Sequence, residues 1–211
     1  MKKEPRWPVL LAITACACLN LLLPESVSAG SGWAVVVLAV SLGGCSAFTV
    51  KRGPSILHYI CAYSTQILVT GVLIYALANL VRDLTIKKGD PLDLLRSAVL
   101  IWGMNILVFA TWYWRLDAGG PTERHSHATY REGAFLFPQT TLSKEARELM
   151  DIKEWHPHFI DYLFLSFNAS TAFSPTDSPV LSRWAKAAMM IQSLIAITAV
   201  ALVAARAVNI L

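Results

Sequence analysis

The chain has 211 residues, of which 55% are hydrophobic and only 15% are charged, and its formal net charge is +4. This balance excludes an ordinary water-soluble domain, in which about a quarter of the residues are charged. The modest, scattered positive charge also argues against nucleic-acid binding. Long apolar runs recur along the chain, so we predict an all-α membrane protein forming one polytopic domain over residues 1–211, with about five transmembrane helices and a short re-entrant helix between the last two.

Residues 8–80 are expected to form three N-terminal helices. The first apolar run, residues 8–23, follows three basic residues and precedes Val27-Ser28-Ala29, a small-residue pattern typical of signal-peptide cleavage sites. It is therefore either a signal peptide or a short first membrane helix, and residues 1–29 leave that choice open. In the second run, residues 32–50, the pair Gly43-Gly44 favours close contact with another helix.

The third predicted helix, from about residue 55 to residue 80, carries polar side chains that include His58 and Gln66. These side chains favour hydrogen bonds between helices, and the alternative is a water-filled path. The four cysteines, which all fall in apolar runs, are Cys16, Cys18, Cys45 and Cys61. That placement predicts small buried side chains and argues against a framework of disulfides in exposed loops.

A charged linker over residues 81–91 leads to a fourth helix, residues 92 to about 116, and Asp90-Pro91 is expected to mark its start. The end of this helix carries Trp112-Tyr113-Trp114 as a predicted interface anchor. Residues 117–158 form a polar insert of mixed charge, which indicates a solvated segment. Within it, Phe135-Leu136-Phe137-Pro138 is expected to anchor back onto the membrane domain. Ser143 is expected to cap a short helix that reaches Met150.

The last stretch has an unusual order of apolar and polar segments. Residues 159–173 are apolar but too few to cross a bilayer, and the run that ends at Leu211 is long enough to cross once. Between them, residues 174–179 contain two prolines, which neither a helix nor a strand accommodates easily. A short helix, a polar turn and a long helix predict a re-entrant hairpin. Irregular backbone at membrane depth must be buried in protein or line water, so we look for function here.

Residues 92–211 resemble the pore module of tetrameric potassium-type cation channels, in which a pore helix, a filter loop and an inner helix follow an outer helix. The family pattern S-F-x-T-x-T-T-V-G-Y-G-D aligns without a gap on residues 166–177. It matches Ser166, Phe167, Thr171 and Asp177. The resemblance implies a homotetramer in membrane lipid and a monovalent cation as the permeant species.

The filter glycines and tyrosine of that family are replaced here. The positions that correspond to the filter are Thr171, Ala172, Phe173, Ser174, Pro175, Thr176 and Asp177. Proline fixes φ, and a β-branched residue disfavours positive φ, so a standard ladder of backbone carbonyls is not expected. Side-chain hydroxyls and a ring of Asp177 carboxylates would then contact the cation. The alternative is a non-conducting membrane scaffold or partner-binding protein.

The chain is also similar to a family of small bacterial integral membrane proteins with W-Y-W-x-L-D-x-G-G-P, F-P-Q and A-F-S-P-T-D motifs, here at residues 112–121, 137–139 and 172–177. That similarity implies a multi-pass protein of the bacterial inner membrane. Sidedness stays open: the count of basic residues favours a cytoplasmic polar insert, whereas channel pore loops enter from outside.

No catalytic motif is present, so an enzyme is not expected, and no cofactor or metal is predicted. The weaker alternative is a membrane enzyme or metal-dependent transporter that uses a metal site formed by the histidine pairs His125/His127 and His156/His158. Asp161, in the first turn of the short helix, is expected to cap backbone amides there.

Overall fold

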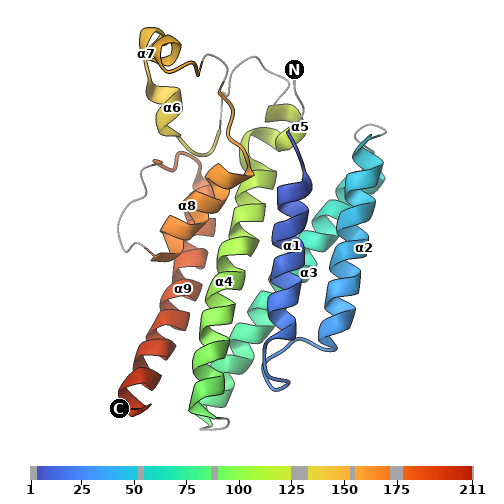
Figure 1. The fold of residues 1–211 in the computed structure, drawn as a ribbon, viewed down its shortest axis with the longest axis vertical. Coiled ribbons are helices and arrows are strands. Elements are labelled where there is room, and N and C mark those ends of the chain that lie inside the picture. Colours follow the sequence, from blue (N-terminus) through green and yellow to red (C-terminus); the bar gives the residue numbers. More distant parts are fainter. Residues whose placement is uncertain are drawn as a thin grey trace. The chain divides into compact units, whose positions relative to one another are not determined.

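A computed structural model of the protein describes residues 4–51, 55–86, 90–124, 133–152, 155–171 and 178–210 (Figure 1). Within these ranges the regular elements are helices, together with one isolated antiparallel bridge between Phe135 and Val180. The helices are α1 (Trp7–Leu21), α2 (Gly32–Lys51), α3 (Ile56–Thr85), α4 (Pro91–Leu116), η1 (Asp117–Gly119), α5 (Pro121–Arg124), α6 (Pro138–Thr141), α7 (Lys144–Leu149), α8 (Phe159–Thr171) and α9 (Arg183–Ile210). The all-α class is confirmed for the described residues.

Among the described helices, α2, α3, α4 and α9 are long and apolar enough to cross a membrane. These four account for most of the five expected spans. The fifth, α1, has only 15 residues. A helix rises about 1.5 Å per residue, so α1 covers about 22 Å of the roughly 30 Å hydrocarbon core. Several apolar helices are therefore compatible with an integral membrane protein.

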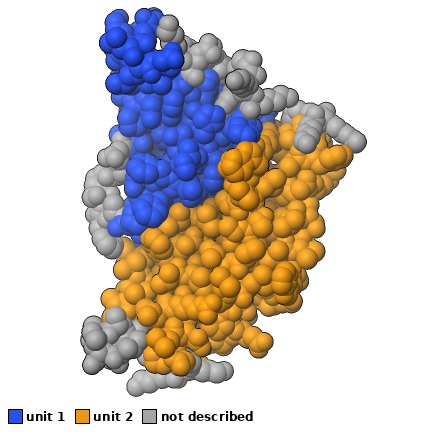
Figure 2. All heavy atoms as spheres, viewed as in Figure 1, with its two compact units in different colours: residues 1–5, 109–193 blue, residues 6–108, 194–211 orange. Residues whose placement is uncertain are grey.

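The chain divides into two compact units, residues 6–108 with 194–211, and residues 1–5 with 109–193 (Figure 2). In unit 2 of Figure 2, residues 6–108 with 194–211, α2 packs against both α1 and α3. A Cβ atom at Gly43 would lie 3.1 Å from Leu10 Cδ2 of α1, whereas one at Gly44 would meet open space. The expected close contact of α2 is therefore made at Gly43.

Polar side chains of α3 bond to neighbouring helices. His58 Nδ1 lies 2.9 Å from the Ser46 carbonyl oxygen of α2, and Gln66 Nε2 donates to the Val108 carbonyl oxygen of α4 at 3.1 Å. These contacts confirm interhelical hydrogen bonding for His58 and Gln66. Thr65 and Thr70 instead donate to carbonyl oxygens of their own helix.

Of two helix boundaries predicted from the sequence, the end of α3 was wrong and the start of α4 was correct. The third helix was expected to end at residue 80, but α3 continues to Thr85 because no proline or glycine interrupts this part of the chain. Its last turn also includes a hydrogen bond from Thr85 Oγ1 to the Val81 carbonyl oxygen at 2.8 Å. The start of α4 was predicted correctly: Asp90 Oδ1 accepts from Leu92 N at 2.9 Å, and Pro91 occupies the first turn.

Unit 1 of Figure 2, residues 1–5 with 109–193, contains the end of α4, the described part of the insert, α8 and the start of α9. After α4 the chain reverses sharply through Gly119 and Gly120, with φ of 75° and 89°. A Cβ atom at Gly120 would lie 2.8 Å from the Arg115 carbonyl oxygen, so glycine is required for this turn. The turn brings α5 back toward the end of α4.

The aromatic cluster at the end of α4 was expected to anchor the helix in the membrane interface. For two of its three rings this was wrong: Tyr113 and Trp114 are buried in the protein. The insert covers Tyr113, because Phe135 packs edge-on against it with ring centroids 5.2 Å apart. The expected anchoring of the insert is thereby confirmed at Phe135, and Phe137 is also buried.

The described insert is less uniformly solvated than its composition suggests. Ser143 caps α7 as predicted, because its Oγ accepts from Ala146 N at 3.2 Å. Hydrogen bonds from its own backbone amide and from the Ser143 hydroxyl lower the pKa of the Glu145 carboxyl. In contrast, Asp117 and Arg124, both expected in water, are buried.

Candidate functional site

The site predicted from the sequence lies around α8 and the start of α9, and the contacts of these helices define their directions (Figure 1). Near their starts, Phe135 lies against both Tyr162 of α8 and Trp184 of α9, at centroid distances of 6.3 and 6.1 Å. Farther along, Ser193 Oγ of α9 donates to the Ala169 carbonyl oxygen near the end of α8 at 3.2 Å. The two helices therefore run side by side in the same direction.

The end of α4 meets the start of α8. Trp114 packs edge-on against Phe159, the first residue of α8, with ring centroids 6.5 Å apart. Because Trp114 lies in the last turn of α4, the chain enters α8 at the level where α4 ends. Thus α4 runs opposite to α8 and α9, and the last two helices begin at a common level.

Gln192 joins α8 to α9 through a buried polar cluster. Its Nε2 donates to the Ser166 carbonyl oxygen, to Ser166 Oγ and to Ser170 Oγ, each at 2.7 Å. Its Oε1 accepts from the Tyr113 hydroxyl of α4 at 2.6 Å. The amide is fully buried, so these partners replace the water it would otherwise bind. The cluster fixes α4, α8 and α9 against one another at one level.

Two backbone hydrogen bonds hold the chain that leads into α9. Leu136 N donates to the Pro179 carbonyl oxygen at 2.9 Å, and Leu181 N donates to the Ala134 carbonyl oxygen at 2.8 Å. These bonds flank the bridge between Phe135 and Val180. The insert is thus tied to the residues immediately before α9, at the level where α8 begins.

A buried ion pair lies beside the start of α8. Arg124 Nη2 donates to Glu4 Oε2 at 2.9 Å, and both side chains are almost completely excluded from solvent. Arg124 Nη1 also donates to the carbonyl oxygens of Trp114 and Asp117, at 3.0 and 3.2 Å. Its guanidinium lies 4.9 Å from the centroid of the Tyr162 ring, a cation–π distance.

Two further acceptors complete this network. Glu4 Oε1 accepts from Trp114 Nε1 at 2.7 Å. The Asp117 carboxylate accepts from the Tyr162 hydroxyl through Oδ2 and from Ala134 N through Oδ1. The network therefore connects residue 4, the end of α4, the insert and α8. We refer to Glu4, Trp114, Asp117, Arg124 and Tyr162 as the entry network.

Asp161 caps α8 as predicted. Its Oδ2 accepts from His158 N at 2.7 Å, the reciprocal contact of a capping box. Burial raises the pKa of the Asp161 carboxyl, while the hydrogen bond from His158 and the charge of Arg124 act in the opposite direction.

Of the seven predicted filter-like positions, only Thr171 is described. It ends α8, is exposed, and donates from Oγ1 to the Phe167 carbonyl oxygen at 2.9 Å. Residues 172–177, which include Ala172, Phe173, Ser174, Pro175, Thr176 and Asp177, lie outside the described residues. Their proposed contact with a cation stays a prediction.

The alternative metal site is not formed among the described residues. His125 and His127 lie outside the described residues, whereas His156 and His158 are described. In the described ranges, no three histidine, cysteine or acidic side chains converge in a way that could hold a metal ion.

The entry network was missed by sequence reasoning, and its members carried unequal signals. Glu4 stands in a basic segment and Arg124 in a segment of mixed charge, so neither pattern indicated burial. The cluster around Gln192 did carry a signal, because Ser166, Ser170 and Gln192 interrupt helices that are otherwise largely apolar. Polar side chains in such helices indicate contacts with other helices.

Comparisons with protein-family models, with curated proteins and with solved structures each found no match to the chain.

Proposed function

We propose that this chain is an integral membrane protein in which α4, α8 and α9 form a pore-like module. In this proposal α8 is a re-entrant helix, and residues 171–177 form the lining loop of a cation-conducting homotetramer. The observation that carries the proposal is that α8 and α9 run side by side in the same direction, with α4 opposed to both. This is the arrangement that a pore helix and an inner helix require.

The direction of the helices explains why the connecting chain would act as a pore loop. Because helices rise about 1.5 Å per residue, Gln192 lies about 14 Å along α9 from Arg183. Gln192 is also at the level of Ser166 and Ser170 near the end of α8. The chain that leaves α8 must therefore return over about this distance to begin α9. A return segment at membrane depth needs protein or water around it.

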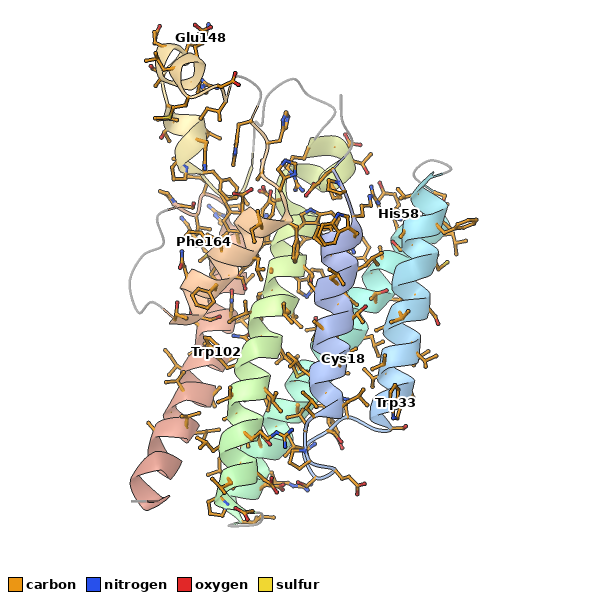
Figure 3. All side chains as sticks on the ribbon, in the orientation of Figure 1. Cys18, Trp33, His58, Trp102, Glu148 and Phe164 are labelled. Atoms are coloured by element: carbon orange, nitrogen blue, oxygen red, sulfur yellow. The ribbon has the colours of Figure 1, made fainter. Side chains whose placement is uncertain are left out.

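Assembly of several copies would provide that surrounding protein. The outward face of α8 carries three large apolar side chains, with Ile160 65%, Phe164 58% and Phe167 45% exposed. Phe164 is labelled in Figure 3. The three side chains recur at helical spacing along one face of α8. A second copy packed on this face would bury them and enclose the return segment from the other side.

Cation flux into liposomes tests conduction. Purified wild-type protein should conduct monovalent cations, and Asp177→Asn should reduce that flux because the ring of carboxylates at the pore mouth is lost. Asp151→Asn is the matched control: Asp151 is exposed on the insert, and its positive φ of 54° is well tolerated by asparagine. Flux equal to that of empty liposomes, with folded and correctly inserted protein, would rule out the pore.

The second candidate function is a non-conducting membrane scaffold. It is favoured by the way the buried polar groups of α8 and α9 bond to one another: Gln192 joins Ser166 and Ser170 of α8 to Tyr113 of α4. A scaffold would keep this rigid hairpin without passing ions. An absence of flux, combined with a stable homo-oligomer in native mass spectrometry, would select it.

A further inference from the structure

Two thiols meet between α2 and α3, in the unit formed by residues 6–108 and 194–211. Cys61 Sγ lies 3.1 Å from Cys45 Sγ, and both are free cysteines. Cys61 is buried, whereas Cys45 is partly exposed. The S–S bond of a disulfide measures about 2.05 Å, so a closure of about 1 Å would join the two sulfur atoms.

The register that brings the thiols together is fixed by a neighbouring interhelical contact. His58, one turn before Cys61, bonds through Nδ1 to the carbonyl oxygen of Ser46, the residue after Cys45 (Figure 3). Arg6 Nη1 lies 3.2 Å from His58 Nε2. A guanidinium only donates, so Nε2 is the acceptor and the ring proton on Nδ1 donates to Ser46.

The connection between the helices limits their sliding. Only residues 52–55 separate α2 from α3, and Ser55 Oγ caps α3 by accepting from His58 N at 3.2 Å. The two helices are therefore antiparallel neighbours whose register is held both by sequence proximity and by the bond between Ser46 and His58. Cys45 and Cys61 face each other within that fixed register.

We propose that Cys45 and Cys61 form a dithiol site that undergoes thiol–disulfide exchange with apolar small-molecule disulfides and closes into a disulfide between α2 and α3. The proposal does not depend on ion conduction. An apolar reagent is required because Cys45 lies about 9 Å inside the end of α2, on a helix with exposed apolar side chains such as Phe48.

The exchange proceeds in two steps. Cys45, the more exposed thiol, loses its proton, and its thiolate attacks one sulfur of the reagent, breaking the reagent S–S bond and releasing the first reagent thiolate. Cys61 then loses its proton and attacks the Cys45 sulfur of the mixed disulfide, which releases the second reagent thiolate. The two cysteines are oxidised by two electrons, and the reagent is reduced to two thiols that take up the two protons.

The full chain, purified in detergent and treated with 4,4′-dithiodipyridine, tests the proposal. The expected product is a cross-link between the peptides that contain Cys45 and Cys61, reversed by dithiothreitol, with two thiopyridone molecules released for that pair. Cys16→Ala/Cys18→Ala protein removes the background, since those two cysteines lie on one helix, one buried and one exposed, and cannot bridge.

Single substitutions serve as matched controls. Cys61→Ser should leave a stable mixed disulfide on the partly exposed Cys45, Cys45→Ser should leave the buried Cys61 largely unmodified, and neither variant should form the cross-link. Separate thiopyridyl adducts on Cys45 and Cys61 of the same chain would overturn the proposal. So would unreacted thiols at Cys45 and Cys61 of the wild-type chain under conditions that modify its exposed Cys18 completely.

A second readout compares oxidised and reduced protein of unchanged sequence, so that no variant has to fold. Closing the loop between residues 45 and 61 should raise the thermal unfolding midpoint by about 5–10 °C, since loops of this length are stabilised by a cross-link. An unchanged midpoint in protein shown by mass to be cross-linked would mean that the bond strains the helix pair, contrary to the fitted register proposed here.

Discussion

At the scale of single residues, Gln192 shows how a buried amide can specify helix positions. Its amide nitrogen bonds to two serine side chains and a carbonyl oxygen of α8, and its oxygen bonds to a tyrosine of α4. Each partner is itself removed from water, so the cluster is stable only when it is complete. Loss of one member leaves its partners buried with one hydrogen bond fewer.

We therefore expect Gln192→Leu to lower the free energy of unfolding by about 1–3 kcal/mol, because Tyr113, Ser166 and Ser170 lose their shared partner. The thermal unfolding midpoint in detergent micelles measures this. Met190→Leu is the control on the same helix, since Met190 is exposed and should tolerate the change. Equal midpoints for the two variants would show that the cluster is not stabilising.

The buried ion pair between Glu4 and Arg124 allows a test by paired substitutions. Glu4→Gln keeps the shape of the side chain but leaves the buried Arg124 charge without its carboxylate, at a cost of about 3–5 kcal/mol. Adding Arg124→Met should recover part of that loss, since the uncompensated charge is then gone. Chemical unfolding measures both, with the exposed Glu148→Gln as control (Figure 3). Strictly additive losses would contradict a direct pairing.

The half-buried carboxyl of Asp161 should make the stability of the folded protein depend on pH. Burial raises the pKa of its carboxyl in the folded state, so protonation favours folding. Its contribution is fully present below the unfolded-state pKa of about 3.9 and is lost as the pH rises through the raised folded-state pKa. Asp161→Asn keeps an acceptor for His158 N and does not titrate.

The measurement for Asp161 is the unfolding midpoint of wild type and Asp161→Asn as a function of pH. The unfolding midpoint of Asp161→Asn should rise relative to that of the wild type as the pH increases from about 4 to about 7, because only the wild type acquires a poorly solvated charge. An advantage for the wild type that grows with pH would mean that the capping bond and the charge of Arg124 outweigh burial.

At the scale of elements, hydropathy and capping signals were sufficient for most helices. Asp90-Pro91 and Ser143 marked helix starts correctly, because capping is decided by local sequence. The end of α3 was placed too early because charge was taken as a stop signal, although charged residues do not interrupt a helix. The burial of Tyr113 and Trp114 was missed because the residues that cover them are distant in sequence.

The insert is anchored to the neighbouring helices through one side chain, Phe135. Phe135 is buried, and its ring contacts Tyr113, Tyr162 and Trp184, one from each of α4, α8 and α9. The apolar run around residue 135 did predict an anchor. Its target could not be predicted, since no local signal states which helices a returning loop will meet.

Phe135→Ala should destabilise the protein by about 3–5 kcal/mol, because it removes the ring on which α4, α8 and α9 converge. Leu149→Ala in the same insert is the control, since Leu149 is 89% exposed. Thermal unfolding measures both variants. A loss for Leu149→Ala as large as that for Phe135→Ala would show that the insert is not anchored through residue 135.

At the scale of the whole molecule, the proposed function depends on the relative directions of three helices: α8 and α9 run parallel, and α4 runs antiparallel to both. The sequence could predict a short helix, a turn and a long helix, but periodicity alone does not state whether the two helices lie parallel or antiparallel. The bonds of Gln192 and Ser193 to α8 define the direction. The filter-like residues after Thr171 stay a prediction from the resemblance.

Disulfide cross-linking of α8 to α9 in a cysteine-free background tests this central claim most directly. Ala169→Cys paired with Ser193→Cys should cross-link within one chain, since these residues are in contact. Ile160→Cys paired with Ser193→Cys should not, because residue 160 lies at the opposite end of α8. The reverse pattern would mean that α8 and α9 are antiparallel, and the pore-like module would then be wrong.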